Sequence, residues 1–139
     1  MSELSVLIAS DSFKGSASSS RVAELLEDGV RRVAPAARVK RLAIADGGEG
    51  TVEAIVSARG GELREVEVAG PLGDPVRARY GLFDGDCAVI EMAEASGITL
   101  IEQTRENALK ASTLGVGQLI LDAVGAGARH VYIGLGGSA

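Results

Sequence analysis

The sequence has little with which to build a covalent or metal-bound scaffold. Its one cysteine, Cys87, can form neither an internal disulfide nor a cysteine-cluster metal site. Such sparing use of cysteine is typical of a reducing compartment, so we expect a cytoplasmic protein in which Cys87 packs as a small hydrophobic side chain. The sole histidine, His130, begins a predicted strand, and no Ser-His-Asp or Cys-His set can be assembled around it.

Long apolar runs and an excess of positive charge are also missing. No apolar run is long enough to span a bilayer, and the N-terminal segment has no basic region of the kind that begins a signal peptide. The 14 lysines and arginines are outnumbered by 19 aspartates and glutamates, which gives a net charge of −5. We therefore expect no general affinity for nucleic acid or for membranes.

What is present is enough apolar sequence for a globular α/β protein, at 46% hydrophobic residues. Residues 4–9 form a short apolar run typical of a strand that is covered on both faces. Apolar positions at helical spacing run from Val22 to Val33 and stop before Pro35, and a second strand is expected over 38–44. This order of strand, helix and strand predicts a right-handed parallel unit.

The later segments extend this pattern and then change it. The further elements expected, in chain order, are a helix over 51–58, a one-sided strand over 62–68, a β-hairpin over 76–92 with one wet face, a helix over 116–124 and a strand over 130–135. Residues 70–75 hold the strongest cluster of backbone breakers, which makes them the best candidate for a domain crossing.

We therefore predict two domains. Residues 1–70 are expected to form the N-terminal part of a Rossmann-like α/β domain with a parallel sheet, and residues 71–139 the beginning of a second, incomplete α/β domain. The sequence stops in a glycine-rich turn at 136–139, where a helix normally follows a strand. We accordingly expect the chain to be a truncated part of a longer protein.

A polar loop carries Lys14 between the first strand and the first helix. Its sequence is Ser10-Asp11-Ser12-Phe13-Lys14-Gly15-Ser16. Backbone N–H groups at such a junction carry partial positive charge and Lys14 adds a full charge, so the loop is a candidate anion-binding turn. The spacing excludes a Walker A loop, because Lys14 precedes Gly15 and the preceding turn has no glycine. A polar turn with a capping serine and no ligand is the open alternative.

The second unusual stretch is Asp46-Gly47-Gly48-Glu49-Gly50, expected at the carboxyl end of the second strand. Ligands of open parallel sheets bind at that edge. Asp46 or Glu49 could hold Mg²⁺, accept a hydroxyl proton or bind hydroxyl groups. The alternative is an acidic turn in which Glu49 favours the next helix N-terminus. If both loops lie on one edge, Lys14 and Asp46 face a shared cleft suited to an anionic, hydroxylated substrate.

Residues 134–139 match the dinucleotide pattern G-x-G-x-x-A after a predicted strand. The match is a weak signal, since the confirming helix and the acidic residue about 20 positions on lie beyond Ala139. It nevertheless keeps a dinucleotide-dependent oxidoreductase among the hypotheses.

Five ordered motifs carry a resemblance that spans the chain. The motifs are Asp11-Ser12-Phe13-Lys14-Gly15-Ser16, Asp46-Gly47-Gly48-Glu49-Gly50-Thr51, Glu91-Met92-Ala93-Glu94-Ala95-Ser96-Gly97, Ser112-Thr113-Leu114-Gly115-Val116-Gly117 and Ile133-Gly134-Leu135-Gly136-Gly137-Ser138-Ala139. In this order they resemble motifs of the bacterial glycerate kinases. The resemblance implies an ATP- and Mg²⁺-dependent kinase that converts D-glycerate to 2-phosphoglycerate. It also implies two α/β domains in a chain much longer than 139 residues.

The resemblance and the loops together give the expected site. Lys14 and Asp46 are the expected catalytic residues, and the expected metal ligands are unknown. The other expected site residues are Asp11, Ser12, Gly47, Gly48 and Glu49 for substrate, and Gly136, Gly137 and Ser138 for nucleotide. The alternative from another class is a non-catalytic nucleotide- or metabolite-binding module. By itself the fragment is expected to be inactive and to self-associate through its incomplete domains.

Overall fold

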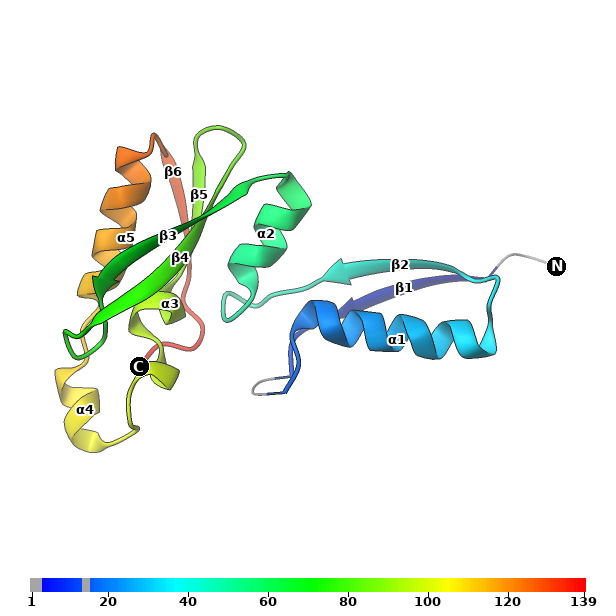
Figure 1. Cartoon of the computed structure of the whole chain (residues 1–139), viewed down its shortest axis with the longest axis horizontal. Coiled ribbons are helices and arrows are strands. Elements are labelled where there is room, and N and C mark those ends of the chain that lie inside the picture. Colours follow the sequence, from blue (N-terminus) through cyan, green and yellow to red (C-terminus); the bar gives the residue numbers. More distant parts are fainter. Residues whose placement is uncertain (1–3, 14–15) are drawn as a thin grey trace. The chain divides into compact units, whose positions relative to one another are not determined.

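The structure is a computed structural model that describes residues 4–13 and 16–139, and it comprises two compact units (Figure 1). The first unit is Met1–Ala45 and the second is Asp46–Ala139. Both units contain helices and strands, which confirms the predicted α/β class. Among the described residues, no helix is long and apolar enough to cross a membrane.

The first unit is a single β-α-β element. Its elements are β1 (Ser5–Ser10), α1 (Ser19–Val33) and β2 (Arg38–Ala43). The two strands pair in parallel, from Ser5 opposite Arg38 to Ser10 opposite Ala43, which confirms the predicted parallel unit. Helix α1 begins where the sequence supplies a cap, because the Arg21 backbone N–H donates to Ser18 Oγ at 3.3 Å.

The predicted cover on both faces of the first strand was wrong for this unit. Ile8 is buried, whereas the neighbouring Leu7 is 62% exposed and Leu42 of β2 is 48% exposed. Alternate residues of a strand point to opposite faces, so Leu7 and Ile8 occupy different sides of the two-stranded sheet. One side is therefore packed and the other leaves apolar side chains open.

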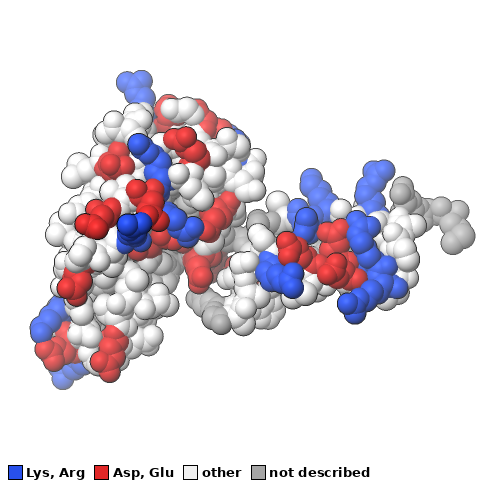
Figure 2. All heavy atoms as spheres, in the orientation of Figure 1, with Lys and Arg blue, Asp and Glu red and all other residues white. Residues whose placement is uncertain are grey.

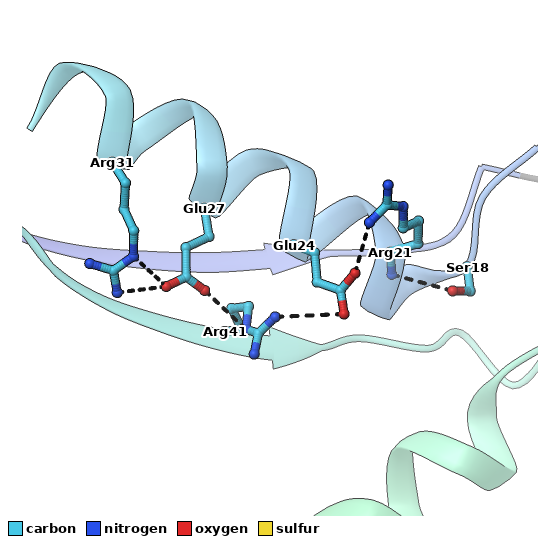
Figure 3. Close-up of polar contacts among 6 residues, drawn as sticks. All are labelled: Ser18, Arg21, Glu24, Glu27, Arg31 and Arg41. Atoms are coloured by element: carbon cyan, nitrogen blue, oxygen red, sulfur yellow. Dashed lines mark hydrogen bonds and ion pairs between the residues drawn. The ribbon is translucent and has the colours of Figure 1, made fainter. Parts of the chain in front are cut away.

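Charged side chains tie α1 to β2 (Figure 3). Glu27 is the most sheltered member, and its carboxylate oxygens lie 2.6 Å from a guanidinium nitrogen of Arg31 and 3.2 Å from Nε of Arg41. Glu24 links Arg21 and Arg41 at 3.1 and 3.9 Å. The other side chains of this group are about half exposed, so each ion pair contributes little to the free energy of unfolding. The main effect of the group is to hold the Arg41 side chain of β2 against Glu24 and Glu27 of α1. On the face shown in Figure 2, acidic and basic side chains are interspersed over both units.

The second unit is built on a four-stranded mixed sheet. Its strands, in the spatial order of the sheet, are β3 (Glu62–Ala69), β4 (Pro75–Phe83), β5 (Cys87–Glu91) and β6 (His130–Gly134). Strand β4 pairs antiparallel with both β3 and β5, and β6 pairs parallel with β5. The helices are α2 (Thr51–Arg59), α3 (Met92–Ser96), α4 (Arg105–Lys110) and α5 (Leu114–Gly125), with a 3₁₀ turn η1 at Ile98–Leu100.

The longer elements were predicted, but the short elements between β5 and α5 were not assigned. Helix α4 has six residues and none is buried, so its sequence carries no apolar periodicity to recognise. The hairpin of β4 and β5 turns at Asp84-Gly85 as expected. Its predicted wet face is present on β4, where the Arg77 side chain is 77% exposed, but β5 is covered on both faces. Strand β5 alternates between two cores, with Ala88 and Ile90 on one side and Val89 on the other.

The two cores lie on opposite faces of the sheet. Helices α3 and α5 cover one face, where Leu119 of α5 packs with the fully buried Tyr80 and Ile90. Tyr80 donates from its hydroxyl to Asp122 on α5 at 2.6 Å, so the largest buried side chain has a polar partner. Helix α2 covers the other face and approaches it closely, since a Cβ on Gly81 would overlap the Val56 side chain.

The breaker-rich segment 70–75 is a hairpin turn and not a crossing between compact units. Gly70 donates its N–H to the Asp74 carbonyl at 2.7 Å, and β3 and β4 pair along their whole length on either side of this turn. Strand β3 and helix α2 therefore pack with the second unit, and the units divide between Ala45 and Asp46. The domain limits of 1–70 and 71–139 stay a prediction for the longer protein.

Candidate functional site

Three of the motif-bearing segments meet at one edge of the second unit. Strands β5 and β6 run parallel and end at Glu91 and Gly134, which lie opposite each other in the sheet. The segment after β6 reaches the acidic loop 46–50, where the Gly136 N–H donates to the Gly47 carbonyl at 2.9 Å. Residues 134–138 and 46–50 are thus in direct backbone contact at the carboxyl ends of two parallel strands, the edge where α/β sheets bind ligands.

Glycine is required at this contact because the two backbones are too close for side chains. A Cβ on Gly134 would overlap the Gly47 carbonyl oxygen, and one on Gly136 would lie 2.7 Å from both Cα and N of Gly48. Gly47 also has φ of 91°, in the left-handed region that side-chain-bearing residues rarely adopt. The close packing of the two loops therefore explains the glycines at 134 and 136, and the backbone conformation explains the one at 47.

Side chains within the acidic loop fix its shape. Asp46 Oδ1 accepts the Gly48 N–H at 3.0 Å, and Thr51 Oγ1 accepts the Gly47 N–H at 3.1 Å while donating to the Gly48 carbonyl at 2.7 Å. Thr51 is buried, whereas Asp46 and Glu49 are exposed. The loop is thus held from within by Thr51 and presents two carboxylates to solvent.

A buried carboxylate from β5 caps the helix that follows this loop. Helix α2 begins after Gly50, which has a left-handed backbone and no side chain to cap it. Glu91 Oε1 accepts the Val52 N–H at 2.7 Å from a position 39 residues away in sequence, and Glu91 is only 3% exposed. Burial raises the pKa of Glu91 above the usual value for Glu, although the backbone N–H groups of Val52 and Gly50 favour its charged form.

The short helix α3 and the turn after it hold the other side of the glycine-rich segment. The Ile98 N–H donates to the Gly137 carbonyl and the Ala139 N–H to the Ser96 carbonyl, both at 2.9 Å. Together these bonds pair Gly97 with Ser138 in an isolated antiparallel β-bridge. The amide of Gly136 is used by Gly47, so the segment is fixed to the chain on both sides.

The motif at 112–117 packs against α3 and against the end of β3. Ser96 Oγ donates to the Ser112 carbonyl at 3.0 Å, and a Cβ on Gly115 would overlap the Ala69 carbonyl oxygen. Gln118 Oε1 on α5 accepts the Ala69 N–H at 2.7 Å. The glycine at position 115 thus lets the start of α5 lie directly against the end of β3.

The opening loop belongs to the first unit. Asp11 Oδ1 accepts the Ser12 N–H at 2.7 Å, and Phe13 and Ala17 form a small bridge in which the Phe13 N–H donates to the Ala17 carbonyl at 2.9 Å. Asp11 is exposed. Lys14, the expected catalytic cation, lies outside the described residues.

Metal ligands are not concentrated in one place. Within residues 4–13 and 16–139, no three His, Cys, Asp or Glu side chains gather into a group that could hold a metal ion. Mg²⁺ commonly binds through one or two carboxylates together with water and substrate phosphates. The exposed carboxylates of Asp46 and Glu49 could meet this requirement, and Mg²⁺ bound there would neutralise phosphate charge.

The structure brings together part of the predicted site and adds residues that sequence reasoning missed. Gly47 and Gly48 of the expected substrate loop touch Gly136 of the expected nucleotide loop. Glu91 and Thr51 were not among the expected site residues. A signal for Glu91 was present, because a carboxylate directly after the apolar run 88–90 is hard to place unless it has a buried partner. The binding roles of the predicted residues remain predictions.

The fold is that of a mixed α/β protein in which two glycine-rich loops meet at the ends of parallel strands. Comparison with protein families matches residues 6–139 to the Glycerate kinase family. A glycerate kinase of Halalkalibacterium halodurans is 50% identical over 135 residues, 96% of this chain and 36% of that protein. A glycerate 2-kinase of Escherichia coli is 45% identical over 137 residues, 98% of this chain and 36% of that protein.

The solved structures agree with the sequence comparisons. A crystal structure assigned as glycerate kinase 2 from Salmonella typhimurium LT2 matches with a TM-score of 0.79 and 46% identity, and the match covers 99% of this chain and 37% of that chain. The chain therefore belongs to the glycerate kinase family. It spans about a third of the length of the curated relatives that it matches.

Replacing Gly136 by Ala tests the loop contact. The added Cβ would press on the Gly48 backbone, which cannot move away as a flexible side chain could, so we expect Gly136→Ala to lower stability by about 1 to 3 kcal/mol. Gly117→Ala is the matched control, since Gly117 lies in α5 with open space around its Cβ position, and alanine there should stabilise by about 0.5 to 1 kcal/mol. Thermal denaturation measures both, and equal effects of the two variants would contradict the packing.

The raised pKa of Glu91 predicts a specific pH dependence of stability. Ionising this buried carboxyl costs more in the folded state, so its contribution is fully present below the ordinary pKa of Glu and is lost as pH rises through the raised folded pKa. Nearby Glu94 and Glu53 act in the same direction. Relative to Glu91→Gln, the wild-type protein should therefore lose unfolding free energy as pH rises from about 4 toward 7. Urea denaturation at a series of pH values measures this difference, and a rising difference would contradict it.

Proposed function

We propose that the full-length protein is an ATP- and Mg²⁺-dependent kinase that transfers a phosphoryl group to D-glycerate and forms 2-phosphoglycerate. Membership of the glycerate kinase family supports this class of reaction. The names of the relatives support the acceptor, since they are a glycerate kinase and a glycerate 2-kinase. The choice of the 2-hydroxyl and of ATP as donor belongs to the proposal.

The observation that carries the proposal within this chain is the hydrogen bond from Gly136 to Gly47. It joins a loop bearing two exposed carboxylates to a glycine-rich segment at the ends of parallel strands. Phosphoryl transfer needs mainly positioning and neutralisation of charge, and little covalent participation by the protein. Two preorganised backbone segments with adjacent carboxylates are suited to that task.

Asp46 is our candidate for the group that accepts the hydroxyl proton. One carboxylate oxygen is held by the Gly48 N–H, which fixes the orientation of the side chain and leaves the exposed carboxylate accessible to a ligand. As the glycerate oxygen bonds to the γ-phosphorus, the bridging P–O bond of ATP breaks, ADP leaves and the hydroxyl proton passes to Asp46. Gly47, Gly48 and Glu49 would bind the remaining polar groups of the substrate, and Gly136, Gly137 and Ser138 the nucleotide.

Lys14 has two candidate roles, together with Asp11 and Ser12 of its loop. It can bind the glycerate carboxylate equally in the ground and transition states, or it can stabilise charge on the transferred phosphoryl group. We favour the second role, because amides at a helix N-terminus can already hold a carboxylate.

The rival is a nucleotide- or metabolite-binding module without catalysis. It is distinguished by incubating purified full-length protein with ATP, Mg²⁺ and D-glycerate. ADP release that depends on glycerate, with formation of 2-phosphoglycerate, supports the kinase. Ligand binding without ADP release above background supports the rival, and formation of only 3-phosphoglycerate would correct the position of transfer. A cytoplasmic location and self-association of the isolated fragment remain part of this proposal.

Lys14→Ala tests the charge in the opening loop. If Lys14 stabilises the phosphoryl group, kcat should fall by about 10² to 10³. A rise in KM with unchanged kcat would instead assign it to substrate binding. Lys40→Ala on β2 is the control, since Lys40 is a cation on a strand with no proposed role, and its kinetics should stay close to wild type. Identical kinetics of the two variants would remove Lys14 from the site.

Asp46→Asn separates the shape of the acidic loop from its chemistry. Asparagine keeps an oxygen that can accept the Gly48 N–H, so the turn should survive, but its amide cannot accept the hydroxyl proton. We expect kcat to fall by about 10² to 10⁴ with little change in melting temperature. Asp74→Asn, in the turn between β3 and β4, is the control and should leave kcat unchanged. Steady-state kinetics with full-length protein measure both, and wild-type turnover of Asp46→Asn would contradict the proposed base.

A further inference from the structure

Glu91 is a buried carboxylate that the proposed chemistry does not use. It is 3% exposed and therefore cannot touch substrate in this structure, yet it sits where the ends of two parallel strands meet the start of α2. We propose that Glu91 is a positioning residue that holds the acidic loop 46–50 in place by capping α2 from the sheet. This inference rests on the proposed function, in which that loop binds substrate.

The first turn of α2 lacks a side-chain cap of its own. The first N–H groups of a helix have no partner inside the helix, and the residue before it normally supplies one. Here that residue is Gly50, which has no side chain. The Thr51 and Ala54 N–H groups reach the carbonyls of Gly48 and Gly50 at 3.2 and 3.0 Å, and the Val52 N–H is satisfied by Glu91.

The hydrogen bonds made by the side chains of Asp46 and Thr51 do not attach the loop to the sheet. Asp46 and Thr51 bond to Gly47 and Gly48, all within the same short segment. These bonds fix the internal shape of the loop, but they do not connect it to the sheet. Glu91 supplies such an attachment, because it is the last residue of β5 and lies opposite Gly134 of β6.

The placement of Glu91 links it to both loops at once. On one side it bonds to the start of α2, directly after the acidic loop. On the other side its strand partner Gly134 begins the glycine-rich segment and packs on Gly47. A shift of α2 along its axis would therefore move the acidic loop relative to the glycine-rich segment. Misplacement of reacting groups by about 1 Å can cost on the order of 100-fold in rate.

The helix itself does not depend on Glu91 for its packing. Val52 and Val56 of α2 are buried with Val89 of β5, and Ile55 packs against the same cluster. Loss of the cap should therefore loosen the loop while α2 stays on the sheet. This separation makes a positioning role measurable apart from a general role in folding.

The test uses full-length protein with three substitutions. Glu91→Met keeps much of the side-chain volume and removes the acceptor, Glu91→Gln keeps an acceptor oxygen without the charge, and Gln118→Ala removes another long-range bond to a backbone N–H, also of 2.7 Å, from the other face of the sheet. Steady-state kinetics with glycerate, at a temperature below the melting temperature of every variant, give kcat and KM. Hydrogen exchange of the backbone amides gives the local opening of each segment.

We expect Glu91→Met to lower kcat/KM for glycerate by about 10- to 100-fold and to speed exchange at the Gly48 and Val52 amides, with α5 still protected. Glu91→Gln should recover most of the activity and protection, because it restores the hydrogen bond. Gln118→Ala should lower the melting temperature with kcat and KM unchanged. If Glu91→Met does not fold, Glu91→Asp, whose oxygen is withdrawn by one methylene, should give the same changes to a smaller degree.

Three outcomes would overturn the inference. They are wild-type exchange at Gly48 and Val52 in Glu91→Met, kinetics of Glu91→Met that match those of Gln118→Ala, and a Glu91→Gln variant as impaired as Glu91→Met. Failure of the proposed function is distinguishable from all three. In that case wild-type protein itself would not phosphorylate glycerate, and the exchange measurements would still decide whether Glu91 holds the loop.

Discussion

The hydrogen bond between Gly136 and Gly47 is the contact on which the arrangement of the second unit's edge depends. It joins two segments that are 89 positions apart, at a separation of 2.9 Å, and it forms only because neither segment carries side chains at the point of approach. Packing of backbone on backbone leaves the amides and carbonyls little freedom to turn, which is the property needed to hold charged ligands in one orientation. Strand β6 and the Glu91 cap of α2 hold the two segments on either side of this contact.

The sheet explains why the contact is stable. Strand β5 is covered on both faces, with α5 packed on Ile90 and α2 packed on Val89. Its last residue then contacts the start of α2, and its parallel neighbour β6 leads directly into the glycine-rich segment. Helices α2 and α5 thus help to fix the position of the glycine-rich segment by packing on β5.

Local features of the fold and the pairings of β1 with β2 and of β4 with β5 were predictable from sequence, whereas the pairing of β3 was not. Apolar periodicity predicted α1 and α5, and the Asp84-Gly85 turn predicted the β4–β5 hairpin. The partner of β3 was missed, because a strand with alternating charged residues pairs equally well with a parallel or an antiparallel neighbour. The breakers at 70–75 suit a tight turn as well as a crossing, and only the register of β3 with β4 distinguishes the two.

For the candidate site, the sequence indicated the individual loops but not the contact between them. Glycine-rich loops were recognised by composition, but their contact requires the three-dimensional path of the chain between residues 50 and 134. Glu91 was missed for a related reason, since its partner is the backbone of Val52, and backbone groups leave no mark in sequence. Family membership recovered by five ordered motifs supplied what local reasoning could not.

Occupation of the α2 N-terminus by Glu91 has an electrostatic consequence. A free helix N-terminus carries about half a positive elementary charge and attracts phosphate, but here a carboxylate of the protein already lies on it. When Glu91 is ionised, its negative charge would repel an anionic ligand that approached this end of α2. In the proposed kinase, the charge of bound phosphates would therefore have to be balanced by mobile cations or by lysine and arginine side chains, and ligand affinity would then depend on ionic strength.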